Sequence, residues 1–420
     1  MSPTADEPLI TNDAVVLGLL LVILFTVFGS SKSKNRYFRS VYRFVPAPLL
    51  CYFFPALLAS FGVVSDEHSK LYFVASRYLL PACLILLTLS IDLRQVVRLG
   101  PKALIMFFTG TFGIVIGGPA ALWLTASFAP DAVVGGGQGA EATWRGLSTV
   151  AGSWIGGGAN QMAMKEVFEV GDKVFTAMIA VDVLVANAWM AVLLWLAGRA
   201  PEIDKRRGAD TSAITAVQRQ VEQFRAKVAR IPELADLVAL LAVAFGGAAL
   251  AHLVADSVAP WIALHAPGLK QLSLTGKFFW LVVVATTFGL GASFTRARAL
   301  EGVGASTVGS AFLYLLIATI GMKMDLSALL NAPMMFVIGL IWICIHALLL
   351  LIVAKVIRAP LFFLAVGSQA NVGGAASAPI VASAFHPSLA SVGVLLAVVG
   401  YALGTYAAWV CGQLLRLVSP

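Results

Sequence analysis

Two glycine-rich stretches interrupt apolar segments that are long enough to cross a membrane. Residues 152–161 read GSWIGGGANQ, and residues 367–375 read GSQANVGGA. Inside a bilayer, backbone that leaves the helical conformation is tolerated only where protein or trapped water satisfies its N–H and C=O groups. Two such breaks in corresponding places indicate a binding site shared between two halves of the chain, which is the arrangement of secondary transporters.

The composition places the rest of the chain in a membrane. Of its 420 residues 59% are hydrophobic and only 12% are charged, which is too apolar for a soluble globular protein. A crossing needs about 20 apolar residues. We therefore predict an all-α polytopic membrane protein of about 12 spans, near residues 13–29, 44–64, 71–91, 102–126, 146–170, 174–197, 234–255, 275–295, 303–322, 334–357, 360–385 and 388–415.

The net charge of +8 could suggest a nucleic-acid partner, but the basic residues lie in short connectors beside apolar segments. Positive loops flanking membrane spans explain them more simply, so we expect no nucleic acid. Residues 1–13 carry no basic residue, and the first apolar run is followed by a basic stretch, which indicates a retained first span. The four cysteines lie singly within apolar segments and predict neither disulfides nor a metal site.

The order of features repeats on either side of a hydrophilic divider at 198–232. Asp92, Pro101 and the first break are matched by Asp325, Pro333 and the second break. Such internal duplication predicts paired transporter repeats. The predicted division is an N-terminal span and basic connector (1–43), a first repeat (44–197) with a broken helix at 146–170, a cytoplasmic amphipathic connector (198–232), a linking span (233–274), and a second repeat (275–420) with a broken helix at 360–385.

The charges of corresponding loops favour inverted repeats. The connector 93–102 is basic whereas its counterpart 326–333 is uncharged, and the loop before the first break is acidic whereas the loop before the second is basic. One conflict remains. If every apolar segment crosses, the basic divider 198–232 emerges on the outer side. One segment must then be re-entrant or miscounted, and 232–272 and the proline-rich 44–64 are the candidates that we consider.

A resemblance adds to this reading. The runs IDK at 203–205 and DTSAI at 210–214, together with residues 152–166 and 367–384, resemble the YjcL-like family of integral membrane proteins of unknown function. The likeness covers the chain from about Val41 onward. That family is similar, at the level of fold, to cation/proton antiporters, bile-acid/sodium symporters and glutamate/sodium symporters. The resemblance implies inverted repeats with crossing broken helices in a mobile core domain against a scaffold domain, and it implies no particular substrate.

The breaks supply candidate substrate-binding groups. A broken helix presents free N–H groups at the start of its second half and free carbonyls at the end of its first. We expect Asn160 and Asn371 to stand where the second halves begin. The alternative is that the glycines only let helices pack closely. The predicted substrate-binding residues are Ser153, Gly157, Gly158, Asn160, Gln161, Ser368, Gln369, Asn371, Gly373 and Gly374.

Asp182 is the side chain that most suggests ion coupling, because it lies near the middle of an apolar span, where an ionised carboxylate costs at least ~2.5 kcal/mol. It could bind Na⁺ together with Asn187, or exchange a proton, with Thr405 as the neutral counterpart in the other half. The alternative is a carboxylic acid that satisfies backbone freed by the break. We expect His346 to be a packed scaffold residue more than a proton relay. We expect Lys165, Glu166 and Glu169 to pair at the interface rather than to bind substrate, and the alternative for Glu166 is that it closes a gate.

The predicted function is an ion-coupled carrier that moves a small organic solute, an anion or an amino acid, by alternating access in a bacterial inner membrane. The alternative is a cation/proton antiporter without an organic substrate, and a passive channel ranks lower. We do not expect an enzyme, because neither an H-E-x-x-H motif nor a G-x-G-D or G-x-S-G site occurs. No cofactor is implied beyond a bound Na⁺. The expected partners are the solute, the coupling ion and the lipid bilayer, and the chain could form a homodimer.

Overall fold

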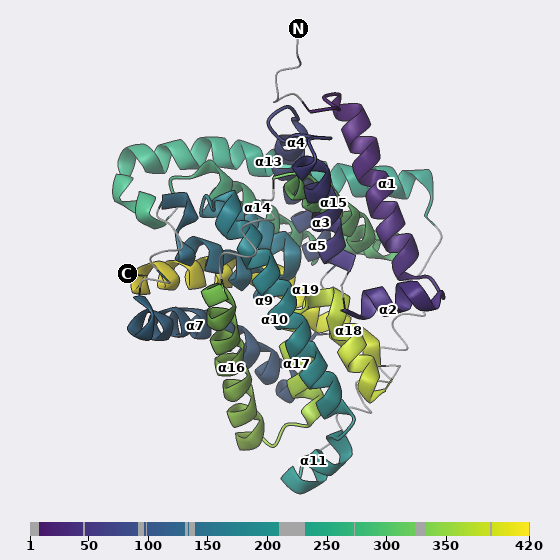
Figure 1. Cartoon of the computed structure of the whole chain (residues 1–420), viewed down its shortest axis with the longest axis vertical. Helices are drawn as coiled ribbons and strands as arrows, with labels where there is room; N and C mark the ends of the chain where they lie inside the picture. Colours follow the sequence, from purple (N-terminus) through teal and green to yellow (C-terminus); the bar gives the residue numbers. More distant parts are fainter. Residues whose placement is uncertain are drawn as a thin grey trace.

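The computed structural model describes residues 8–44, 47–90, 96–97, 99–130, 133, 139–209, 232–272, 274–323, 333–386 and 389–419. This part of the chain is helical and contains no strand (Figure 1). Asp92, Asp325 and most of the predicted amphipathic connector lie outside the described residues. The prediction of an all-α polytopic membrane protein is confirmed.

Each of the twelve predicted apolar segments coincides with one or more helices of the described part. The helices before the divider are α1 (Asp13–Ser31), α2 (Arg36–Phe44), α3 (Ala47–Ser60), α4 (Leu71–Val74), the π-helical η1 (Ala75–Leu79), α5 (Leu80–Leu89), α7 (Pro101–Phe128), η2 (Gly139–Glu141), α9 (Thr143–Val167), α10 (Asp172–Ala197) and α11 (Ala200–Arg207). The helices after it are α13 (Leu234–His265), η3 (Pro267–Leu272), α14 (Lys277–Ala292), η4 (Arg296–Val303), α15 (Ala305–Gly321), α16 (Pro333–Val356), α17 (Leu361–Val372), α18 (Gly374–Phe385) and α19 (Ala390–Val418).

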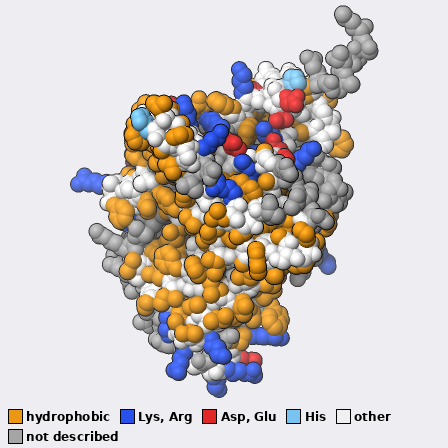
Figure 2. Space-filling view, turned by 90° about the vertical axis from the view of Figure 1, so that its left-hand side faces the viewer, with side chains coloured by type: hydrophobic (Ala, Val, Ile, Leu, Met, Phe, Trp, Pro, Cys, Tyr) orange, Lys and Arg blue, Asp and Glu red, His pale blue; other side chains and the backbone are white. Residues whose placement is uncertain are grey.

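Seven helices among the described residues are long and apolar enough to cross a membrane, or eight if α14 and η4, bent by 94° at their junction, form one span. These seven are α4 to α5 taken together, α1, α7, α10, α13, α16 and α19. Figure 2 shows a broad apolar surface on one face, with Lys and Arg side chains gathered at its lower end and acidic and basic side chains mixed toward its upper end. That distribution suits a belt in contact with lipid.

Helix α9 does not run through the molecule but doubles back at Gly157. The backbone there is non-helical, and the residues on either side of α9 lie together: the Gly171 N–H donates to the Ala140 carbonyl at 2.8 Å. The Trp144 and Phe168 rings are 5.7 Å apart, although a continuous helix would separate these residues by about 36 Å. We call α9 hairpin 1, with arms 143–156 and 158–167.

Helices α17 and α18 form a second hairpin. Gln369 and Ser377 are hydrogen-bonded at 2.7 Å, whereas eight positions along a straight helix span about 12 Å. At the open end, the rings of Phe362 and Phe385 are in edge-to-face contact with centroids 5.4 Å apart. We call residues 361–385 hairpin 2. Both broken helices are therefore re-entrant, and the expectation that they pass through the membrane is corrected.

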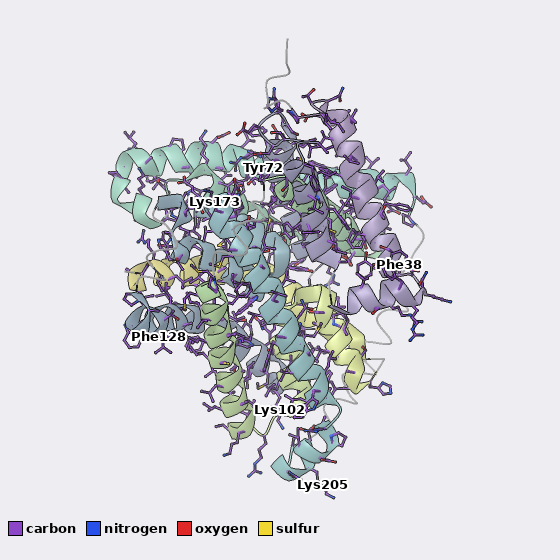
Figure 3. The ribbon with its side chains drawn as sticks, in the orientation of Figure 1. Phe38, Tyr72, Lys102, Phe128, Lys173 and Lys205 are labelled. Atoms are coloured by element: carbon purple, nitrogen blue, oxygen red, sulfur yellow. The ribbon has the colours of Figure 1, made fainter. Side chains whose placement is uncertain are left out.

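The two hairpins open toward opposite ends of the molecule. Figure 3 places Lys102 and Lys205 at the lower end and Tyr72 and Lys173 in the upper part. Hairpin 1 ends just before Lys173, and hairpin 2 begins at Leu361, whose N–H donates to Asp204 beside Lys205. Because a re-entrant hairpin returns to the side it came from, the basic connectors before α7 and after α10 lie on the same side.

This geometry removes the conflict that the charges raised. The re-entrant segments are 143–167 and 361–385, whereas the candidates 232–272 and 44–64 form α13 with η3 and α3. If the other ten predicted segments all cross, including the short helices α3, α14 and α15, the basic connectors at 32–43, 198–209 and 355–358 fall on one side, as the positive-inside rule requires. The division into two inverted repeats stays a prediction.

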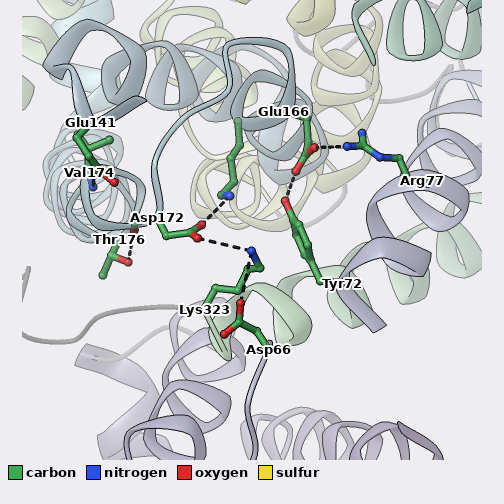
Figure 4. Close-up of polar contacts among 10 residues, drawn as sticks. Asp66, Tyr72, Arg77, Glu141, Glu166, Asp172, Val174, Thr176 and Lys323 are labelled. Carbon is green, nitrogen blue, oxygen red and sulfur yellow. Dashed lines mark hydrogen bonds and ion pairs between the residues drawn. The ribbon is translucent and has the colours of Figure 1, made fainter. Parts of the chain in front are cut away.

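Charged side chains tie the open end of hairpin 1 to the helices beside it (Figure 4). Arg77 pairs with Glu166 at 3.2 Å, and the Tyr72 hydroxyl also donates to Glu166. Asp172 pairs with Lys165 at 2.8 Å and with Lys323 at 3.6 Å. The cluster joins α4, η1 and the end of α15 to the junction of α9 and α10, so Glu166 is an interfacial anchor at this end.

Labelling from one side of the membrane tests the topology. We expect Ser33→Cys and Ala209→Cys, each with Cys344 replaced by Ala, to react with a membrane-impermeant maleimide from the same side, because hairpin 1 does not cross. A Glu67→Cys variant should react from the opposite side. If residues 33 and 209 are labelled from opposite sides, α9 crosses the membrane and the re-entrant assignment is wrong.

Candidate binding site at the hairpin tips

The tips of the two hairpins meet inside the molecule. Gly157 has φ 69° and ψ −175°, and Gly374 has φ 58°. These conformations suit glycine, because an L side chain is strained there. A Cβ atom built on Gly374 would lie 3.8 Å from the Gly157 Cα. The second arms of both hairpins begin at this point, so two helix N-termini and partly exposed glycine backbone face one location.

Asp182 of α10 holds the tip of hairpin 1. Its carboxylate accepts from the Ser153 hydroxyl at 2.6 Å and the Trp154 indole N–H at 2.8 Å on the first arm, and from the Gln161 amide at 3.0 Å on the second. The side chain is buried, with 8% of its surface exposed. Three donors on one acid join the two arms to each other and to α10. The structure thus brings Asp182, predicted for the coupling ion, into contact with Ser153 and Gln161, which were predicted for the substrate.

Gln369 bridges the arms of hairpin 2 without an acid. Its amide nitrogen donates to the Ser377 hydroxyl across the turn, and both side chains lie so close to Gly373 that a Cβ atom there would collide with them. The Gln369 carbonyl oxygen is buried, with 1% of the residue exposed, and no donor among the described residues forms a hydrogen bond with it. A buried acceptor without a donor costs about 1–3 kcal/mol. This oxygen is a free ligand atom at the tip.

Two asparagines fasten the tips by the same arrangement. Asn160 donates to the Gly156 carbonyl at 3.0 Å and to the Tyr401 carbonyl of α19 at 2.9 Å, and it accepts from Thr405 at 2.7 Å. Asn160 therefore binds three groups: the carbonyl four residues before it, a carbonyl of the unbroken helix α19, and a threonine one turn beyond that carbonyl.

Asn371 repeats the arrangement in hairpin 2. It donates to the Gly367 carbonyl at 2.8 Å and to the Phe107 carbonyl of α7 at 3.0 Å, and it accepts from Thr111 at 2.7 Å. Asn371 lies in α17, before the turn, so the expectation that it begins the second half-helix is corrected. Both amides are consumed in fixing the hairpins to α7 and α19.

Ser368 connects hairpin 2 to a buried histidine. His346 Nδ1 lies 3.0 Å from the Gly110 carbonyl, which can only accept, so Nδ1 carries the proton. In the neutral ring Nε2 then accepts from the Ser368 hydroxyl at 2.8 Å, and the Trp189 indole donates to the Ser368 oxygen at 2.8 Å. His346 is fully buried and its ring nitrogens are both partnered, which agrees with a scaffold residue.

The other predicted ion ligands lie apart from Asp182. Asn187 donates to the Val183 carbonyl of its own helix at 2.7 Å. Five positions correspond to about 140° around a helix, so its side chain leaves α10 on another face. Thr405 bonds Asn160 and lies 3.0 Å from the Thr286 hydroxyl. Among the described hydrogen bonds, neither residue contacts Asp182.

Two participants were not predicted from sequence, namely Trp154 at Asp182 and Thr111 at Asn371. Ser377 belongs to the polar groups expected at the second break, but its pairing with Gln369 was not predicted. Two signals could have found them. Ser153 and Gln161, like Gln369 and Ser377, are polar pairs eight positions apart with a glycine midway. The sequences FFTGT at 107–111 and YALGT at 401–405 share an aromatic residue, a glycine and a threonine at the same spacing. Both signals mark places where one backbone approaches another closely.

These features define an all-α integral membrane protein built around two re-entrant hairpins. The chain belongs to the family described as "Protein of unknown function (DUF819)", which matches residues 17–418. It is similar to the uncharacterized membrane protein YjcL of Bacillus subtilis (strain 168), with 25% identity over 360 residues that cover 82% of this chain and 83% of that protein.

Adjacent glycines at the first tip offer a matched test. Gly157→Ala should lower the free energy of unfolding by about 1–3 kcal/mol, because its positive φ strains an L residue and its Cβ would lie 3.4 Å from the Tyr401 ring. Gly158→Ala should be close to neutral, since its Cβ would meet only Leu313 at 3.6 Å. Thermal unfolding in detergent measures both variants. Equal stability of the two would show that the chain does not turn at Gly157.

Proposed function

We propose that this protein is an ion-coupled secondary active transporter of a small organic solute, with its binding site at the tips of hairpins 1 and 2. One observation carries the proposal: within a set of membrane-length helices, two glycine tips meet beside the buried Gln369 oxygen, which has no hydrogen-bond partner among the described residues. Chain turns in the middle of a bilayer are tolerated where they line a cavity or a binding site. Close packing alone does not call for an unpartnered acceptor.

The tip chemistry favours a solute with an acidic group and a hydrogen-bond donor. The starts of the second arms at Gly158 and Gly374 carry partial positive charge and attract a carboxylate. The Gln369 oxygen can accept from a hydroxyl or an ammonium group. An organic anion or an amino acid meets both conditions, and its binding would relieve the cost of the unpartnered oxygen.

Asp182 is our candidate for the residue that binds the coupling ion, either Na⁺ or H⁺. For Na⁺, the Asp182 carboxylate and the Ser153 hydroxyl supply oxygen ligands of the type that hard cations take, and the Trp154 and Gln161 N–H donors would have to move aside to admit the ion. For a proton, the Ser153 hydroxyl at 2.6 Å can donate to the ionised acid or accept from the protonated one. Both forms therefore keep their hydrogen bond, which allows the acid to change state without an orphaned partner.

The second candidate is a cation/proton antiporter without an organic solute, in which the Asp182 carboxylate would bind the cation and the proton in turn. Alternating access in either case follows from motion of the hairpins against their neighbours. The fold-level relation to ion-coupled symporters and antiporters, location in a bacterial inner membrane and a homodimeric assembly belong to the same proposal. We propose no enzymatic activity.

Ion-dependent stabilisation of the purified protein tests the role of Asp182. If Na⁺ binds the folded state, replacing choline by Na⁺ at constant ionic strength should raise the melting temperature of the wild type by about 2 °C or more. If a proton binds instead, lowering the pH should have this effect. Asp182→Asn keeps the size of the side chain and removes the charge, so it should lose this response. Asp256→Asn, which alters an exposed pair with Lys277, should retain it.

Transport in proteoliposomes then separates the two candidates. A Na⁺ or pH gradient should drive current or uptake when carboxylates or amino acids are supplied, and Asp182→Asn should abolish it. If the gradients dissipate each other without any added solute, the antiporter is favoured. If Asp182→Asn keeps the full ion response in both assays, Asp182 is not the coupling site.

A further inference from the structure

One face of α10 contacts both hairpins. Asp182 binds hairpin 1, and Trp189 donates to Ser368 in the first arm of hairpin 2 at 2.8 Å. The two residues are seven positions apart, which places them within about 20° of each other around a helix and about 10 Å apart along it. Figure 1 shows α10 running past α9 and α17. Two residues on the same face of α10 thus contact the two hairpins: Asp182 binds the tip of hairpin 1, and Trp189 binds the first arm of hairpin 2.

The contact continues beyond the end of α10. The connector helix α11 follows at once, and its Asp204 accepts from the Leu361 N–H at 2.8 Å. Leu361 is the first residue of α17, where a helix leaves N–H groups free and favours a negative charge. Asp204 is buried, with 8% of its surface exposed. The segment from α10 to α11 therefore contacts hairpin 2 at its beginning and near its tip.

At Ser368 the contact enters a directional chain of hydrogen bonds. Trp189 can only donate, so Ser368 accepts from it and turns its own proton toward His346 Nε2. His346 in turn donates to the Gly110 carbonyl on α7 at 3.0 Å. A shift of α10 at Trp189 would break the first of these bonds and leave buried polar groups unpaired, which is costly.

We infer that α10 couples the two hairpins, with Trp189 as the positioning residue that transmits the state of Asp182 to hairpin 2. A change of charge or ligand at Asp182 alters the three hydrogen bonds that set the position of α10 against hairpin 1, and the Trp189–Ser368 bond passes that displacement to α17. The inference rests on the proposed function only for what the coupling serves, because the mechanical link is measurable without transport.

Hydrogen exchange measured by mass spectrometry tests the coupling in a double-mutant cycle. Asp182→Asn should raise exchange by about fivefold or more in peptides of both 143–167 and 361–372. In a Trp189→Phe background, which keeps the ring and removes the indole N–H, Asp182→Asn should raise exchange in 143–167 only. Trp195→Phe is the matched control on the same helix, because Trp195 is 57% exposed, and it should leave the response of 361–372 unchanged.

Three outcomes would overturn the inference: no response of 361–372 to Asp182→Asn, an equal response with and without the Trp189 indole, or the same loss in Trp195→Phe. Should Trp189→Phe not fold, Trp189→Leu removes the same indole N–H and must give the same result. A wild-type protein that shows neither an ion response nor transport, together with an intact cycle, would reject the proposed function and leave the coupling standing.

Discussion

Backbone polar groups cannot be left unpaired inside a bilayer, and this constraint governs the whole structure. A chain that turns back in mid-membrane must bring the turn against protein. Here each turn lies against the other, since a Cβ atom built on Gly374 would lie 3.8 Å from the Gly157 Cα. The surrounding helices supply fixed polar partners, namely Asp182, Tyr401 and Thr405 for hairpin 1 and Phe107, Thr111 and His346 for hairpin 2. The paired tips are therefore both the fold's most demanding feature and its candidate site.

The two hairpins are alike in construction and differ in charge. Each carries an asparagine bound in the same way to an unbroken helix, and each has a polar pair across its turn. Among the described residues, hairpin 1 has an acid between the pair and hairpin 2 does not, and hairpin 2 has a buried acceptor without a donor, the Gln369 oxygen. That asymmetry suits a site in which one tip responds to a cation and the other contacts a solute. Helix α10 touches both, so the two events need not be independent.

Much of this could be predicted from the residues. Apolar length located the helices, and glycine next to amides located the breaks. Asp182 was identified because an acid in mid-membrane is costly without partners. The hairpins were not predicted, since a broken helix and a re-entrant one have the same local composition. The charge pattern did indicate that one segment does not cross the membrane. It could not identify which one, because the charge of a loop indicates the side on which the loop lies and not the path of the segment before it. Asn371 was misplaced because the turn follows it by two residues, at a glycine pair that could equally have turned earlier.

The most direct measurement of the central claim is the distance between the ends of each broken helix. Paired cysteines at Trp144 and Phe168, and at Phe362 and Phe385, should be joined by a short cross-linker in the folded protein, because their rings lie 5.7 Å and 5.4 Å apart. Continuous helices would hold the same pairs about 35 Å apart. Efficient cross-linking of both pairs is the result that re-entrant hairpins predict, and spin labels separated by about 35 Å at either pair would contradict it.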